Sequence, residues 1–480
     1  MKPILGLALW SCLISIHLAA QQSDQQTMPG MNTPPSQPPT PAITRSEPQP
    51  QSNRPVLSLD DLEQMGLANN PTLGQADAEV RAAQARERQA GLYPNPTVGY
   101  QGEQIRGGSF RGGEQGAFVA QDIVLGGKLG AAKKVAEQEL KQTEAEREEQ
   151  KLRTLNGIRL AYYQALAAQE TVALRARLLK VAQDALQTSK QLFNVGQADQ
   201  PDLLQAAVEA DQADLVLTAA QENQQRVWKS LAAVVGRPDL PFSPLSGNLE
   251  DVPDVNPDEW LQKLLTESPA IKIARLGVAR AQAQLARAQK EPIPDLLLRG
   301  GIEQNRELME PSGQPVGLQG FAEIGVQLPL FNRNQGNIQA AKAGIERAQL
   351  EADRVQLLLR ERLSSPIQNY LTAKAAVDRY RNRMIPNAEN AYKLYLEKYG
   401  TMTAAYPQVL IAQRTLFQLK TDYVAALESA WLNAISLKGF LLTDGLEAPT
   451  GPAEIDRPIR ETNVPMPERT MSPLDTMPRP

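Results

Sequence analysis

The stretch FAEIGVQLP, residues 321–329, alternates between two kinds of residue with a period of two. In an extended strand, one face carries Ala322, Ile324, Val326 and Leu328, and the other carries Phe321, Glu323, Gly325 and Gln327. A strand of about nine to ten residues with one apolar and one polar face has the reach of a tilted strand that crosses a membrane. The pattern therefore predicts a membrane strand.

Three further segments complete two predicted hairpins. Residues 97–105 and 117–125 flank the loop RGGSFRGGEQ, and 295–303 precedes a longer loop that contains Pro311 and Pro315. Four strands cannot close a barrel, and an open edge leaves backbone groups unpaired in lipid. Copies of the chain must therefore share one sheet. Side chains fill an eight-stranded dimer barrel, whereas the twelve strands of a trimer leave a lumen.

The chain repeats itself at an offset of 198 residues. Three prolines of the first half return at that offset: Pro71, Pro94 and Pro96 as Pro269, Pro292 and Pro294. The folded part, roughly 56–448, is therefore predicted to be a tandem duplication, with repeats at 56–250 and 251–448.

Helices are predicted to fill the rest of each repeat. Each repeat begins with a helical segment of about 30 residues, near 58–92 and 257–291, which Pro71 or Pro269 breaks or bends. A second and much longer helical run follows each hairpin.

The two long runs span residues 131–195 and 338–399. The first has no proline and one glycine, Gly157, and about 1.5 Å per residue gives it a length on the order of 100 Å. The second carries Pro366 and Pro386, where we expect kinks. Each run ends at a glycine turn, and another helix of about 35 residues follows.

Residues 1–20 have the features of an export signal, with a basic start, a short apolar run and small residues before the expected cleavage near Ala20. Lipidation of Cys12 is the alternative. Cys12 and His17 are the only cysteine and histidine, so the cleaved chain lacks Cys nucleophiles, Ser-His-Asp triads, disulfides and zinc sites built on His or Cys. No Asp or Glu pair lies in a recognisable catalytic context. The sequence thus predicts no enzyme, no cofactor and no metal site.

The composition of the two ends and the net charge of the chain give two further predictions. Residues 21–55 and 449–480 are rich in proline and are predicted to be flexible tails. The chain has 50 basic and 54 acidic residues, a formal charge of -4, which argues against nucleic acid as a partner.

Both hairpins leave and return between helices, so every helix is predicted to lie on one side of the membrane, in the periplasm.

Six short motifs, in order over the two repeats, carry a resemblance to a known family. They are Asn70-Pro71, Tyr93-Pro94, LGGK at 125–128, LPLFNRNQGN at 328–337, Ile385-Pro386 and AQRTL at 412–416. The sequence resembles the TolC-like outer membrane efflux proteins, also called outer membrane factors. Within them it is most similar to the branch of cation and heavy-metal efflux systems.

The resemblance implies a mainly α fold with membrane β-hairpins: a homotrimer with a twelve-stranded barrel in the outer membrane lipid and a periplasmic α-helical barrel. It implies a passive conduit of a tripartite efflux system, with metal cations or small toxic compounds as cargo. The implied partners are a periplasmic adaptor (membrane fusion protein) and an inner-membrane pump of the RND type. Three alternatives stay open: a type I protein-secretion duct, a periplasmic adaptor and a coiled-coil structural protein.

Two sets of site residues follow from the resemblance. Val195 with Gly196 and Tyr399 with Gly400 match the helix-hairpin tips that adaptors contact in the family. Glycine also ends helices wherever they occur, and both interpretations can hold together.

The second set concerns a constriction at the periplasmic mouth. The family often has acidic rings on the helix after the second tip, but here residues 407–412 read PQVLIA, without a carboxylate. The first repeat instead has Asp199 and Asp202 near its tip. We hypothesise a constriction lined by Asp202, Gln408 and Ile411, with Asp199 as a further candidate. The alternative is that either aspartate only caps the helix after the tip.

Overall fold

The computed structural model describes residues 56–105, 113–196, 199–309, 313–401, 403 and 406–449. All of them belong to one compact unit, Arg54–Pro480. The predicted signal at 1–20, the tail at 21–55 and all but Pro449 of the tail at 449–480 lie outside the described residues.

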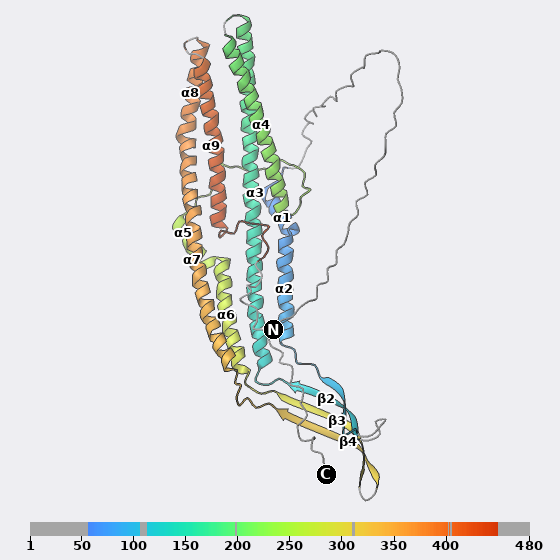
Figure 1. The fold of residues 1–480 in the computed structure, drawn as a ribbon. Coiled ribbons are helices and arrows are strands. Elements are labelled where there is room, and N and C mark those ends of the chain that lie inside the picture. The colour runs from blue at the N-terminus through green and yellow to red at the C-terminus, as the bar shows by residue number, and fades with distance from the viewer. Residues whose placement is uncertain are drawn as a thin grey trace, which may run out of the picture. The chain divides into compact units, whose positions relative to one another are not determined.

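The elements follow the same order twice (Figure 1). The first series is α1 (Leu59–Asn69), α2 (Pro71–Ala90), β1 (Thr97–Glu103), β2 (Glu114–Ile123), α3 (Lys128–Asn194) and α4 (Gln200–Val234). The second is α5 (Pro257–Glu267), α6 (Pro269–Lys290), β3 (Leu296–Met309), β4 (Gln314–Val326), α7 (Gln335–Arg379), the π-helical turn η2 (Tyr380–Met384), α8 (Ile385–Gly400) and α9 (Tyr406–Lys438). The prediction of a mainly helical chain with β-hairpins is confirmed.

The repeated prolines divide the first helical segment of each series. Asn70 ends α1 and also caps α2, because its side chain accepts a hydrogen bond from the Thr72 N–H at 2.9 Å. Pro71 and Pro269 occupy the first positions of α2 and α6, where the missing N–H costs no helical hydrogen bond. The helix therefore stops and restarts at each proline, as predicted.

The two prolines of the second long run behave differently from each other. Helix α7 continues without interruption through Pro366, where the carbonyl left without a donor belongs to the exposed Arg362 and can bind water. Before Pro386 the chain instead forms the π-helical turn η2, which accommodates the proline ring by widening the helix. The corresponding α3 is one helix of 67 residues.

The strands form one antiparallel sheet in the order β1-β2-β3-β4. Two expectations about its loops are wrong. Glu114 and Gln115 belong to β2, opposite Glu103 and Gly102, and Pro315 pairs with Leu308 inside β4 rather than lying in the loop. Pro315 is the second residue of β4 and lies opposite the register shift between Asn305 and Leu308, and a proline is tolerated at such an irregular strand start.

The main core joins α1, α3, α4 and α9, with Leu62, Ile158, Leu231 and Ala430 fully buried in it. The segment 439–449, which we call the C-terminal strap, crosses α3 beside this core.

The C-terminal strap is held by buried amide side chains. Asn156 Nδ2 donates to the carbonyl of Gly439 at 3.0 Å, and Gln150 Nε2 donates to the carbonyl of Glu447 at 3.0 Å. Gly157 lies at the crossing, where a Cβ would come within 2.7 Å of the Gly445 nitrogen. The single glycine of the first long run therefore marks the place where the strap passes over α3.

Gly157→Ala is expected to lower the free energy of unfolding by about 2 kcal/mol, because the added methyl group forces the strap away from α3. Gly130→Ala on the same helix is the control, since a Cβ there meets nothing within 4 Å. Thermal unfolding of the detergent-solubilised variants measures the difference. Equal stability of the two variants would contradict the close approach.

Glu146 on α3 gives the stability a pH dependence. Burial raises its pKa to about 7; the charges of Glu149 and Glu79 act in the same direction, while the hydrogen bond from Gln142 and the charge of Arg280 oppose it. The folded chain thus holds this proton up to a higher pH than the unfolded chain does. The contribution to stability is complete at a pH below the unfolded pKa and is lost as the pH rises through about 7.

Glu146→Gln is therefore expected to raise the stability at pH 8 by about 1–2 kcal/mol, after allowance for solvent screening, and to change it little at pH 4. Denaturation midpoints of the two proteins across this range measure the effect. A constant difference between them would show that Glu146 ionises normally.

Candidate functional site: the membrane sheet and the helical tips

The sheet has one apolar face that nothing covers among the described residues. The paired strands place on this face a set of large, exposed side chains: Val98, Tyr100, Val119, Leu298, Ile302, Leu318, Ile324 and Val326. Ile302 is 61% exposed and Ile324 is 73% exposed. A contiguous apolar surface on an antiparallel sheet is typical of strands that face lipid.

The opposite face of the sheet is polar. Arg299 lies over the ring of Phe118, with 4.2 Å from its guanidinium carbon to the ring centroid, and contacts the Glu323 carboxylate at 3.6 Å. Asn305 Nδ2 donates to Glu114 at 2.6 Å. This face can therefore line a water-filled lumen.

In the described structure, β1 and β4 each pair on one side only. Their outer edges present unpaired backbone groups, which a lipid environment does not tolerate. The sheet of one copy is thus incomplete as a membrane structure.

The first tip has the geometry that its sequence predicts. Val195 follows α3 and is 67% exposed. Gly196 has φ +74°, and a Cβ there would meet nothing within 4 Å. Both residues are accessible to a partner, and Gly196 also supplies the left-handed turn that ends the helix.

At the second tip, Gly400 is the last residue of α8, and the turn lies beyond it. The N–H of Thr401 donates to the Glu397 carbonyl at 3.2 Å, and the N–H of Thr403 donates to the Lys398 carbonyl at 2.8 Å. Tyr399 is half-buried. Burial, and then the negative charge of Asp202, raise the pKa of Tyr399, so the structure brings a residue of the second tip into the electrostatic range of the first.

The proposed constriction residues lie at the beginnings of α4 and α9. Asp199 is at the cap position of α4, but its side chain makes no capping hydrogen bond, and Asp202 lies in the first turn. Gln408 and Ile411 are exposed on one face of α9, whereas Val409 is buried on another. Both pairs are therefore placed near the tips, and Gln408 and Ile411 present a free surface.

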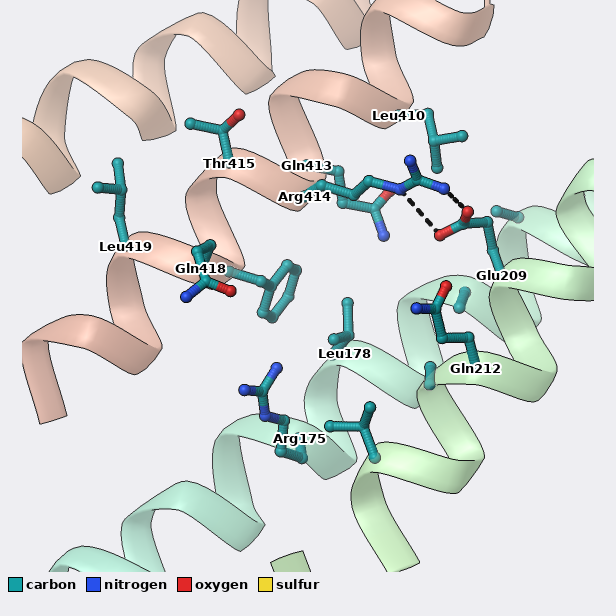
Figure 2. Close-up of a pocket in the computed structure, with 15 residues that line it drawn as sticks. Arg175, Leu178, Glu209, Gln212, Leu410, Gln413, Arg414, Thr415, Gln418 and Leu419 are labelled. Atoms are coloured by element: carbon teal, nitrogen blue, oxygen red, sulfur yellow. Dashed lines mark hydrogen bonds and ion pairs between the residues drawn. The ribbon is translucent and has the colours of Figure 1, made fainter. Parts of the chain in front are cut away.

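An ion pair between α4 and α9 was not predicted. Arg414 Nε donates to Glu209 Oε2 at 3.0 Å, and a second guanidinium nitrogen contacts Oε1 (Figure 2). The pair borders a cavity of about 680 Å³ between α3, α4 and α9, whose lining includes Leu178 and Phe417. Arg414 belongs to the AQRTL motif, but no feature of the sequence identifies Glu209 as its partner.

Two properties of the described residues bear on other kinds of site. None of their helices combines the length and apolarity needed to cross a membrane. Within the same part of the chain, no group of three or more His, Cys, Asp or Glu side chains is arranged to hold a metal ion.

Comparison with known proteins identifies relatives that match most of the folded part. The family described as "Outer membrane efflux protein" matches residues 62–237 and 260–441. The chain is 28% identical to the cobalt-zinc-cadmium resistance protein CzcC of Cupriavidus metallidurans, over 66% of this chain and 75% of that protein. It is also 28% identical to the nickel-cobalt-cadmium resistance protein NccC of Alcaligenes xylosoxydans xylosoxydans, over 62% of this chain and 66% of that protein.

Solved structures show the same fold. CusC superposes with a TM-score of 0.66 at 17% identity, over 80% of this chain and 91% of that structure. The outer membrane protein VceC of Vibrio cholerae gives 0.62 at 22% identity, over 81% and 97%. The apolar sheet face, the duplicated helical order and the match across both repeats lead to one conclusion: the chain is a TolC-like channel of the outer membrane and belongs to the outer membrane efflux protein family.

Proposed function

We propose that three copies of this chain form the exit duct of a tripartite efflux system that expels divalent metal cations. The duct is a passive conduit without a catalytic step. A periplasmic adaptor, which contacts the tips at Val195, Gly196, Tyr399 and Gly400, connects it to an inner-membrane pump of the RND type.

The observation that carries this proposal is the incomplete sheet. In the part that the structure describes, each copy offers four strands, two open edges and one uncovered apolar face. Two copies would give an eight-stranded barrel that its own side chains fill, and three copies give twelve strands with a lumen. The polar face around Arg299 and Asn305 then lines that lumen.

The helices support association of copies as well. Leu350, Leu357 and Leu371 on α7 are exposed at multiples of seven residues, and Leu204, Val208 and Leu215 form a similar exposed stripe on α4. Such stripes are typical of helices that pack against a partner helix. In a trimer, the stripe of one copy can be covered by the next copy.

The relatives support a metal cargo. CzcC and NccC are named for resistance to cobalt, zinc, cadmium and nickel. In this proposal the pump selects the metal, and the duct lets a hydrated cation pass.

In this proposal the gate lies at the tips. Asp202, Gln408 and Ile411, with Asp199 beside them, would form threefold rings around the axis of a trimer. The Arg414–Glu209 ion pair connects α9 to α4 further from the tips than these residues and would hold the rings closed until the adaptor separates the helices.

The proposal is tested by mass and by transport. The native mass of the full chain in mild detergent is expected to equal three copies, and deletion of its gene is expected to sensitise the host to cobalt, zinc and cadmium. A monomeric mass would overturn the shared barrel. Unchanged metal sensitivity, with increased sensitivity to organic toxic compounds, would overturn the metal cargo but leave the duct.

A further inference from the structure

The junction between the membrane sheet and the long helices exposes large apolar side chains. Phe331 is 91% exposed, and Leu328 and Leu330 beside it are exposed as well. Tyr93, just before β1, lies at the same end of the sheet and is also exposed. We call these residues, together with Lys290 and Arg333, the junction collar.

The junction collar carries two cations, Lys290 and Arg333. Lys290 Nζ lies beside Gly127, 3.2 Å from where a Cβ of that glycine would be. Asn334 Nδ2 donates to the Ala288 carbonyl at 2.8 Å, which brings the neighbouring Arg333 close to the same end of α6.

The acidic groups nearby cancel this charge only in part. Asp295 is already occupied, because its Oδ2 accepts from Lys128 Nζ at 2.9 Å and its Oδ1 accepts from the Leu125 N–H at 2.9 Å. Glu291, which is exposed next to Lys290, offsets one of the two positive charges, so Lys290, Arg333 and Glu291 together keep a net charge of +1. The junction is thus locally basic, although the whole chain has a formal charge of -4.

We infer that the junction collar binds the headgroups of anionic phospholipids in the periplasmic leaflet of the outer membrane. The collar adjoins the apolar sheet face, so its aromatic rings lie at the depth where the hydrocarbon ends and the headgroups begin. Arg333 lies two residues after Phe331 along the chain, and Lys290 ends the helix that Asn334 contacts, so both cations can donate to phosphodiester oxygens at this depth. This inference depends on the outer membrane location and not on the adaptor, the pump or the cargo.

The test uses the full chain in nanodiscs made of equal parts of phosphatidylglycerol and phosphatidylcholine. Native mass spectrometry of the released protein counts the lipids of each kind that remain bound. The wild type is expected to retain phosphatidylglycerol preferentially. Each basic residue near an anionic surface contributes about fivefold, so Lys290→Gln with Arg333→Gln is expected to reduce the preference about 25-fold.

The matched control is Arg177→Gln with Lys180→Gln. These residues are exposed on α3, form no ion pair among the described residues and remove the same charge. The control is expected to keep the wild-type preference. Equal loss in both double variants, or a wild type that retains the two lipids equally, would overturn the inference.

The same lipid-retention measurement is repeated with inorganic phosphate added. If it displaces phosphatidylglycerol from the wild type, the collar is a site for soluble anions and the lipid assignment is wrong. This measurement on the wild type needs no variant. The same spectra also give the mass of the oligomer, so a variant that fails to assemble can be told apart from one that has lost its lipid preference.

Discussion

Arg414→Gln is expected to increase the open fraction of the channel about 100-fold. An exposed ion pair contributes about 1 kcal/mol, and three symmetry-related pairs that break together contribute about 3 kcal/mol, or two decades in the closed-to-open ratio. The physical reason is that Arg414 and Glu209 connect α9 directly to α4. Conductance of single trimers in planar bilayers measures the open fraction.

The control for this prediction is Arg354→Gln. Its ion pair with Glu351, at 2.6 Å, lies within α7 and joins no two helices, so the conductance should stay at the wild-type level. Exchanging the charges, with Arg414→Glu and Glu209→Arg in one chain, should restore the closed state. If Arg414→Gln leaves the channel closed, the ion pair is no part of the gate.

Ile302→Arg is expected to abolish insertion of the folded protein into phospholipid vesicles. Ile302 lies on the apolar face near the middle of β3 and is 61% exposed. An arginine facing lipid near the bilayer midplane costs about 2–4 kcal/mol, and a trimer carries three of them. Folding yield into vesicles, read from the mobility of the unheated trimer in gel electrophoresis, measures the effect.

Glu303→Arg, at the next residue, is the matched control. Its side chain points to the polar face, so the same guanidinium enters the lumen and insertion should continue. Equal loss in both variants would show that the two faces do not differ in their contact with lipid, and would remove the basis for the shared barrel.

Much of the architecture could be predicted because it depends on local patterns. The two-residue alternation at 321–329 indicated a strand with two unlike faces, and the exposed Ile324 and Val326 lie on the apolar one. Pro71 and Pro269 indicated where helices restart. Strand ends were less predictable, because hydrogen bonding to a neighbouring strand extends β3 and β4 beyond the alternating segment.

In the candidate site, too, some features could be predicted from local sequence patterns and others depended on packing. Glycines predicted where the helical runs end, and Gly196 has the left-handed conformation that such an end requires; contact of these tips with an adaptor came from the family resemblance and stays a prediction. The turn after Gly400 shifted to Thr401 and Thr403 because their N–H groups find free carbonyls at the end of α8. The placement of Gln408 and Ile411 on the exposed face of α9 needed the packing of that helix.

The sequence alone determined the duplication, the membrane strands, the long helices and the absence of cysteine and histidine beyond residue 17. Only the tertiary structure decided that Arg414 pairs with Glu209 and that the C-terminal strap crosses α3 at Gly157. It also decided that Asp202 lies close enough to Tyr399 to raise the pKa of that tyrosine. The reason is physical. Periodicity and proline chemistry act within a few neighbouring residues, whereas a contact between side chains some 200 residues apart depends on how whole helices pack.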